Sequence, residues 1–300
     1  MLTFNSIEPQ RIYGGASSDW ITLDLSYEIP EGATGAIVQI RNTSYGNIRN
    51  VGMRKPGSTV ELPGKLVYGC YTWGLVGCDD SRRIQVYSPG GGEIEYYIMG
   101  YTGLNVHYLA QAINFTPPEN VWADLDCSPY IPANADAVIF NVSAASSGYS
   151  QYAIRKKGST DDHYSFFYQN YPILGTDVNG KVKIRLRKVG PAYCRACLIG
   201  YIIGGITMHT NSIDISPAIF SAWRNHQISS YGATTHYAIV ETNGIGSVAP
   251  WGIRKSGSLR EITAGVRYHQ WAYPHCNVDR LIQMYREDDF IRFYEIGVVE

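Results

Sequence analysis

Hydrophobic and polar side chains alternate along many short stretches of this chain. After Trp20, the apolar residues Ile21, Leu23 and Leu25 alternate with polar residues. Such alternation predicts a half-buried β-strand, because neighbouring side chains of a strand point to opposite faces. Comparable short runs follow in each hundred residues, with glycine-rich turns between them. No stretch has the spacing of an amphipathic helix longer than two turns, so the pattern predicts an all-β protein.

The motif Arg-Lys-x-Gly-Ser occurs three times, and its arginines are 101 and 99 residues apart. A tryptophan lies upstream of each copy, and an apolar run ending in glycine lies downstream. The matching positions are Arg54, Arg155 and Arg254 in the motif, Trp20, Trp122 and Trp223 upstream, and Gly100, Gly200 and Gly297 downstream. Self-similarity at a fixed period indicates tandem copies of one structural unit.

We therefore expect three domains, 1–101, 102–201 and 202–300, the first with a lead-in at 1–19. The expected fold class is all-β, with three tandem antiparallel β-sandwich repeats of jelly-roll-like type and about 100 residues each. The apolar residues of 102–121 and 202–222 alternate in part, so each segment should supply the first strand of the next sandwich. Two arrangements stay open, a rod and a cluster around a pseudo-threefold axis.

The amino-acid composition limits the kinds of partner that the protein is expected to bind. Charged residues make up 17% of the chain and the net charge is −1, so no strong field attracts nucleic acid or an anionic membrane. No run of about 18 apolar residues occurs, and we expect no membrane span. The start has no basic or apolar signal region, so we expect no signal peptide. The 24 tyrosines fit both β-propensity and a contact surface.

The six cysteines do not form a matched set across the repeats. Cys194 and Cys197 make a C-x-x-C pair, but residues three apart on a strand point to opposite faces. This disfavours both a disulfide and joint metal binding, and the second C-x-x-C of a zinc ribbon is missing. We expect reduced and mostly buried thiols.

Acidic and amide residues recur at one turn of each repeat, at 79–80, 177–179 and 277–279. They suggest calcium, but the ligand pattern of a calcium-binding loop does not follow. Hydrogen bonds from these side chains to the local backbone explain them better, so we expect turns and no metal. The third repeat alone has His275-Cys276 with His269 nearby. A packed or exposed turn histidine is favoured there over a metal set or a Cys–His dyad.

No catalytic motif stands out. The sequence lacks G-x-S-x-G, H-E-x-x-H, a P-loop and a dinucleotide-binding fingerprint in its proper context. Carboxylates do not pair at equivalent repeat positions, as a glycosidase would require. We therefore expect a protein that is not an enzyme and has no cofactor.

The motif hairpins are the candidate site. Three basic tips at regular spacing suit contacts with a repeated partner, such as a carboxylate on a neighbouring subunit. In the structural alternative, each arginine stacks on an aromatic of its own repeat while Gly-Ser closes the turn. The candidate contact residues are Arg54, Lys55, Ser58, Arg155, Lys156, Ser159, Arg254, Lys255 and Ser258.

The pattern resembles tandem β-sandwich repeats in structural proteins of tailed bacteriophages. Those repeats run from a G-x-R-x-x-G-S hairpin, through an aromatic and an Asp-rich turn, to a strand ending in Gly-Tyr. The matching positions here are Gly52, Arg54, Gly57, Ser58, Trp73, Asp79, Gly100 and Tyr101. Two departures are Ala153 in the second repeat and Gly297-Val298 in the third. The resemblance spans nearly the full chain and assigns no residue-level activity.

The resemblance implies a non-enzymatic virion protein in capsid decoration, the neck, the tail or a fibre. Its expected partners are other virion subunits, either in a homo-oligomer or on a capsid or tail lattice. Its expected location is the virion, after synthesis in the host cytoplasm. The alternative is a host-receptor or carbohydrate-binding attachment module, in which loop tyrosines and tryptophans stack on host-surface glycans.

Overall fold

The structure is a computed structural model. It describes residues 2–59, 63–89, 92–144, 151–166, 168–190, 193–218, 220–228, 235–244, 250–258, 263–265 and 269–300. Over these ranges there are 25 strands and no helix, so the prediction of an all-β protein is confirmed. No helix in this part of the chain is long and apolar enough to cross a membrane.

The strands fall into three groups that follow the sequence repeats. Repeat 1 contains β1 (Phe4–Gly14), β2 (Ser17–Asp24), β3 (Gly35–Asn42), β4 (Arg49–Arg54), β5 (Gly64–Leu66), β6 (Tyr71–Gly77), β7 (Arg83–Ser88) and β8 (Ile94–Thr102). Repeat 2 contains β9 (Val106–Phe115), β10 (Ala123–Asp126), β11 (Ala137–Ala144), β12 (Gln151–Lys156), β13 (Ser165–Phe166), β14 (Gln169–Asn170), β15 (Ile173–Gly175), β16 (Lys181–Leu186) and β17 (Cys194–Ile202). Repeat 3 contains β18 (Ile206–Asp214), β19 (Phe220–Gln227), β20 (Tyr237–Gly244), β21 (Pro250–Lys255), β22 (Thr263–Gly265), β23 (Gln270–Ala272), β24 (Leu281–Arg286) and β25 (Ile291–Val299).

Within each repeat the strands belong to two antiparallel sheets, which we call the axial sheet and the lateral sheet. The axial sheets are β1-β8-β3-β6, β9-β17-β11-β14 with β15 also on β11, and β18-β25-β20-β23. The lateral sheets are β2-β7-β4-β5, β10-β16-β12-β13 and β19-β24-β21-β22. Strands β9 and β18 each open a new repeat within segments 102–121 and 202–222, but each belongs to a small sheet of a blade and not to a sandwich.

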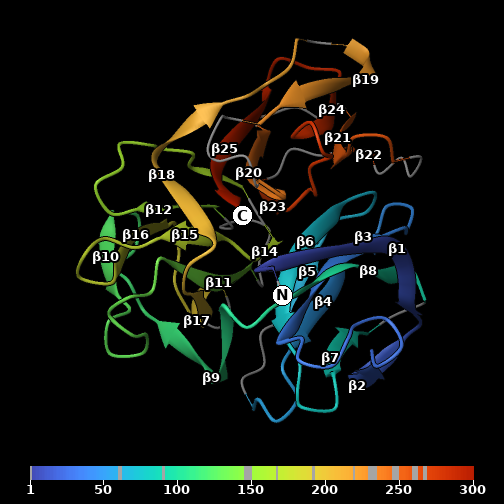
Figure 1. Ribbon diagram of the computed structural model, residues 1–300, viewed down its shortest axis with the longest axis horizontal. Helices are drawn as coiled ribbons and strands as arrows, with labels where there is room; N and C mark the ends of the chain where they lie inside the picture. The colour runs from blue at the N-terminus through green and yellow to red at the C-terminus, as the bar shows by residue number, and fades with distance from the viewer. Residues whose placement is uncertain are drawn as a thin grey trace.

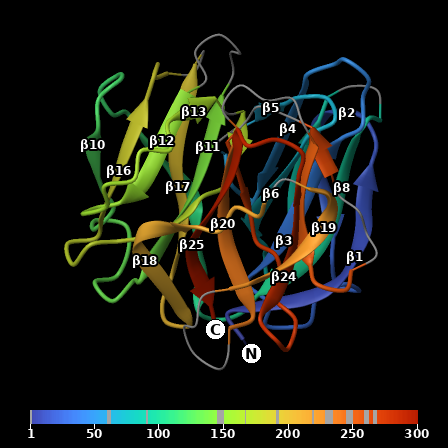
Figure 2. The ribbon, with the colours of Figure 1, turned by 90° about the horizontal axis from the view of Figure 1, so that it is seen from above.

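The three repeats surround a common centre, with the blue, green and orange-red parts of the ribbon as three lobes (Figure 1). Strands β6, β14 and β23, one from each axial sheet, contact one another there. Seen from above, the sheets stand side by side and the two ends of the chain lie near each other (Figure 2). The repeats therefore form a cluster and not a rod.

The prediction of three tandem jelly-roll-like β-sandwiches is wrong. The six small sheets are arranged as six blades, in the manner of a β-propeller. The main hydrophobic core is shared, because it joins residues of all three repeats, among them Trp73, Phe140 and Trp251. A second core in repeat 1 takes in Tyr171 of repeat 2. Alternation in the sequence marks which side chains face inward, but it does not say which sheet they face.

Two local predictions are confirmed. The side chains of Asp79, Asp177 and Asn277 each accept hydrogen bonds from two backbone N–H groups of their own turn, at 2.8–3.0 Å. All six cysteines are free thiols and buried. Burial raises the pKa of both Cys194 and Cys197 to about 12, so both are protonated at neutral pH.

Candidate functional site

Each motif arginine stacks on the tryptophan of its own repeat. The guanidinium carbons of Arg54, Arg155 and Arg254 lie 4.2, 3.9 and 3.9 Å from the ring centres of Trp20, Trp122 and Trp223. The hairpin turn closes in the same way each time, since the backbone N–H of the motif serine donates to the lysine carbonyl at 3.1 Å. The stacking alternative is thus confirmed, and contact with an outside partner stays a prediction.

The motif glycine allows this turn. The φ angles of Gly57, Gly158 and Gly257 are 83°, 96° and 85°, in the region where a side chain is strained. The hairpins of repeats 1 and 2 lie against the first strand of the next repeat. We name the three meeting places interface 1–2, interface 2–3 and interface 3–1 after the two repeats that they join.

Amide side chains join hairpin and strand at two of these interfaces. At interface 1–2, Gln111 of β9 accepts a hydrogen bond from Thr59 N at 2.9 Å and donates to Gly57 O at 3.0 Å. At interface 2–3, Asn211 of β18 accepts from Thr160 N at 2.8 Å. Among the described residues, the hairpins of repeats 1 and 2 thus hold neighbouring repeats together.

Interface 3–1 differs because the first strand of repeat 1 has one residue fewer in an irregular stretch of its pairing. Strands β9 and β18 place four residues in an irregular stretch of their pairing, 109–112 and 209–212. Strand β1 places only three there, 7–9. In this stretch Glu8 and Pro9 stand where the other strands carry Gln111 and Asn211. In this stretch β1 therefore offers one residue fewer to the hairpin of repeat 3 than β9 and β18 offer to theirs.

A change in side-chain size accompanies the shorter stretch. At interface 1–2, Tyr108 packs directly on Gly77, where an added Cβ would lie 2.6 Å from the Cβ of Tyr108. At interface 2–3, Met208 packs on Gly175 in the same way, at 2.8 Å. At the equivalent positions of interface 3–1, the small residue lies on the first strand and the large residue faces it, the reverse of the other two interfaces. Ser6 replaces the large side chain and His275 replaces the glycine.

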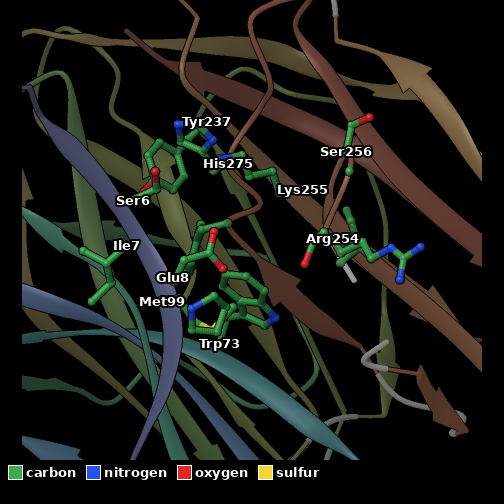
Figure 3. Close-up of a pocket in the computed structure, with 15 residues that line it drawn as sticks. Ser6, Ile7, Glu8, Trp73, Met99, Tyr237, Arg254, Lys255, Ser256 and His275 are labelled. Atoms are coloured by element: carbon green, nitrogen blue, oxygen red, sulfur yellow. The ribbon is translucent and has the colours of Figure 1, made fainter. Parts of the chain in front are cut away.

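A cavity of about 380 Å³ lies at interface 3–1, and we call it the closing cavity. The hollow between hairpin and strand at interface 1–2 measures only about 30 Å³. A wider and more open hollow of about 600 Å³ lies beside it, around Lys55, Asp79 and Tyr108. Figure 3 shows Tyr237, His275 and Lys255 along the upper side of the closing cavity, with Glu8, Met99 and Trp73 below them. Its volume lies within the range of small-molecule sites. The opening therefore has the dimensions of a site for a compact ligand.

Two polar groups of residues that line the closing cavity have no hydrogen-bond partner among the described protein atoms. Trp73 is 4% exposed, and its indole Nε1–H finds no acceptor among the described residues. Nδ1 of His275 also lacks a partner there. Burial, together with the charges of Lys255 and His236, lowers the pKa of His275 to about 4, so this ring is neutral at neutral pH. Both atoms are buried and unsatisfied, so a ligand group that reaches them gains a hydrogen bond, and the histidine stays uncharged.

A second polar cluster joins repeats 2 and 3. The carboxylate of Glu241 contacts Nε2 of His269 through one oxygen and Nδ1 of His163 at 2.5 Å through the other. Ser212 Oγ lies 3.4 Å from His163 Nε2, so Ser212, His163 and Glu241 are connected as in a Ser-His-acid triad.

The surroundings of Ser212 do not suit acyl transfer. The Ser212 backbone N–H donates to the Asp161 carboxylate at 2.8 Å, which places negative charge where an oxyanion would develop. In the described ranges, no group of three or more His, Cys, Asp or Glu side chains is arranged so that it could hold a metal ion. We infer that Glu241 and its two histidines clamp interface 2–3, and we name them the His–Glu–His clamp.

The structure distributes the predicted site residues over the three interfaces. Arg254, Lys255 and Ser258 line the closing cavity, and Arg54, Lys55 and Ser58 line the small hollow at interface 1–2. The turn that holds Arg155, Lys156 and Ser159 lies against Asn211 at interface 2–3. Sequence reasoning missed Ser6, Glu8 and the role of Trp73. The available signal was His275, a residue private to the third repeat.

No model of a protein family matches the sequence, and no curated protein matches it.

Proposed function

We propose that this protein is a non-enzymatic attachment protein that binds a terminal glycan residue in the closing cavity. The supporting observation is the break in threefold symmetry. The same hairpin-to-strand contact is filled at interface 1–2, but at interface 3–1 it leaves a cavity of about 380 Å³. The cavity coincides with a residue exchange, since Ser6 and His275 stand where interface 1–2 has Tyr108 and Gly77.

The lining suits a sugar. Aromatic side chains supply large rigid contact surface, and Tyr237 and Tyr273 contribute it together with Trp73. The buried indole N–H of Trp73 gains an acceptor when a sugar hydroxyl or ring oxygen enters, which removes the penalty of an unmade hydrogen bond. Glu8 and Lys255 at the exposed rim provide an acceptor and a donor for further hydroxyls.

A glycan array tests this function. The probes are oligosaccharides with terminal glucose, galactose, N-acetylhexosamines and uronic acids, followed by titration of the strongest binder. We expect Trp73→Phe to weaken binding about tenfold, because one neutral hydrogen bond is lost. Tyr171→Phe changes the equivalent position of repeat 2, outside the cavity, and should leave affinity unchanged. Retention of no glycan, or equal affinity of Trp73→Phe and the unchanged protein, would overturn the proposal.

A second candidate function is that of a virion subunit, acting through contacts with other subunits. One observation favours it. Val178 and Val278 occupy equivalent turn tips in repeats 2 and 3, and each is 98% exposed. Apolar side chains at repeated exposed positions suit contacts between copies. Solution mass from light scattering separates the cases, since a subunit of this kind forms oligomers that Val178→Ser and Val278→Ser together dissociate.

A further inference from the structure

Three equivalent lysines follow the motif arginines, and their settings differ. The side chain of Lys55 lies along interface 1–2, where its Cδ would meet a Cβ at Gly77 at 3.2 Å. Lys156 has the same contact with Gly175 at interface 2–3. Lys255 is exposed at the mouth of the closing cavity, beside His275. No ion pair of Lys255 is found over the described ranges, so its charge faces the cavity mouth without neutralisation.

The neighbouring arginine does not share this freedom. Arg254 lies over Trp223, and its Nε donates to the Gln283 side chain at 2.9 Å. Its guanidinium is therefore engaged on the far side of the hairpin, within repeat 3. Lys255 is the cation that an entering ligand meets first.

A carboxylate lines the same cavity. Glu8 belongs to β1 of repeat 1, and Lys255 to the hairpin of repeat 3, so the two come from opposite walls. They form no ion pair with each other, which means that their charged atoms are more than 4.0 Å apart. Two opposite charges thus line one volume without neutralising each other. A ligand that fits both needs an anionic group for Lys255 and hydrogen-bond donors for Glu8.

The lining of the closing cavity also includes a hydrogen-bond donor, Trp73, and an uncharged imidazole ring, His275. Trp73 Nε1–H is a buried donor, and His275 carries no charge that would compete for the anion. The cavity is lined by β21, which is paired on both sides within its sheet, and by residues 6–9 of β1, the edge strand of its sheet. Side chains of two repeats surround this volume, which suits a compact ring with several hydroxyls.

We propose that the closing cavity selects an acidic sugar, with the ligand carboxylate on Lys255, ring hydroxyls on Glu8 and an oxygen acceptor at the indole N–H of Trp73. This inference rests on the proposed glycan-binding function. A carboxylate held by an ammonium group makes a charge-assisted hydrogen bond, which is stronger than the neutral bond that a hydroxymethyl group makes.

The test uses a matched pair of probes, oligosaccharides that end in glucuronic acid or in glucose. The two differ only in a carboxylate in place of a hydroxymethyl group. We expect the acid to bind about tenfold more tightly, with a preference that decreases as salt is raised. Lys255→Gln should bring the two affinities together. Lys55→Gln removes the equivalent charge at interface 1–2 and should leave the preference intact.

Glu8→Gln supplies an independent arm. Because Glu8 accepts from ring hydroxyls common to both probes, its loss should weaken both by a similar factor. A gain for the acidic probe alone would show that Glu8 only repels it, and would overturn the assignment. Equal affinity of the unchanged protein for the two probes would overturn the acidic-sugar inference and leave the proposed function standing. Binding of neither probe, nor of any other array glycan, would overturn both.

Discussion

Single side chains join the repeats, and Glu241 does so from a fully buried position. It is 1% exposed and lies between His163 and His269. Burial alone would raise the pKa of its carboxyl, but the charges of His269 and His163 outweigh burial and lower the pKa of Glu241 to about 2. For His163, burial acts to lower the pKa, and the attraction and hydrogen bond of Glu241 raise it overall.

The His–Glu–His clamp predicts a pH-dependent stability. Glu241 stabilises the fold above its ordinary pKa of 4.5 and loses this contribution as the pH falls toward about 2. His163 contributes fully below its ordinary pKa of 6.5 and loses its contribution as the pH rises through the raised value. The two contributions overlap between about pH 4.5 and 6.5. Denaturant unfolding at a series of pH values should therefore show that the clamp contributes most to the free energy of unfolding in that window.

Glu241→Gln tests the clamp directly. We expect it to reduce the free energy of unfolding by about 3 kcal/mol near pH 5.5, as for the loss of one partner from a buried ion pair. The loss should shrink toward pH 2 and above pH 8. Glu93→Gln is the control, because Glu93 pairs with Arg49 in a partly exposed position and should cost less than about 1 kcal/mol. A loss from Glu241→Gln that does not vary with pH would contradict this account.

At the scale of elements, the length of one irregular stretch in β1 decides where the closing cavity lies. Residues 109–112 and 209–212 carry the side chains that meet the hairpins at interfaces 1–2 and 2–3, and 7–9 carry one residue fewer. The cavity should therefore close when the residues of a filled interface are transferred to it.

The double substitution Ser6→Tyr with His275→Gly makes this transfer, because it recreates the contact of Tyr108 with Gly77. We expect it to abolish glycan binding and to keep or raise the stability, by up to about 2 kcal/mol, as cavity-filling changes do. Thermal unfolding and array binding measure the two effects. Ser81→Tyr, on an exposed turn of repeat 1, is the matched control and should retain binding. Full binding by the double variant would place the ligand elsewhere.

The strands, the three-part period and the Arg–Trp stacks could be predicted from the sequence, because each depends on residues close together or on repetition. The stack of Arg54 on Trp20 recurs in every repeat and so shows itself by spacing. The closing cavity could not be predicted. It depends on which residue of β1 pairs with β8, and this register is set by the sheet and not by the local pattern. The contact of His163 with Glu241 joins two repeats, so the sequence pattern within a single repeat does not predict it.

At the scale of the whole molecule, one shared core makes the three repeats a single unit. Inward-facing residues such as Trp73, Phe140 and Trp251 belong to the same hydrophobic core, although they come from three repeats. The expectation of three separate sandwiches failed at this scale, because it assumed that each repeat closes on itself. A molecule with three nearly equivalent interfaces offers three similar hairpin tips, but the structure opens a cavity of ligand size where repeat 3 meets repeat 1.

The stoichiometry of glycan binding tests this claim most directly. Isothermal titration would use the glycan that the array retains most strongly, with the unchanged protein and with the variant that combines Ser6→Tyr and His275→Gly. A single site at interface 3–1 predicts one ligand per chain for the first protein and none for the second. Three equivalent ligands per chain, or one ligand that the double variant still binds, would contradict the closing cavity as the site.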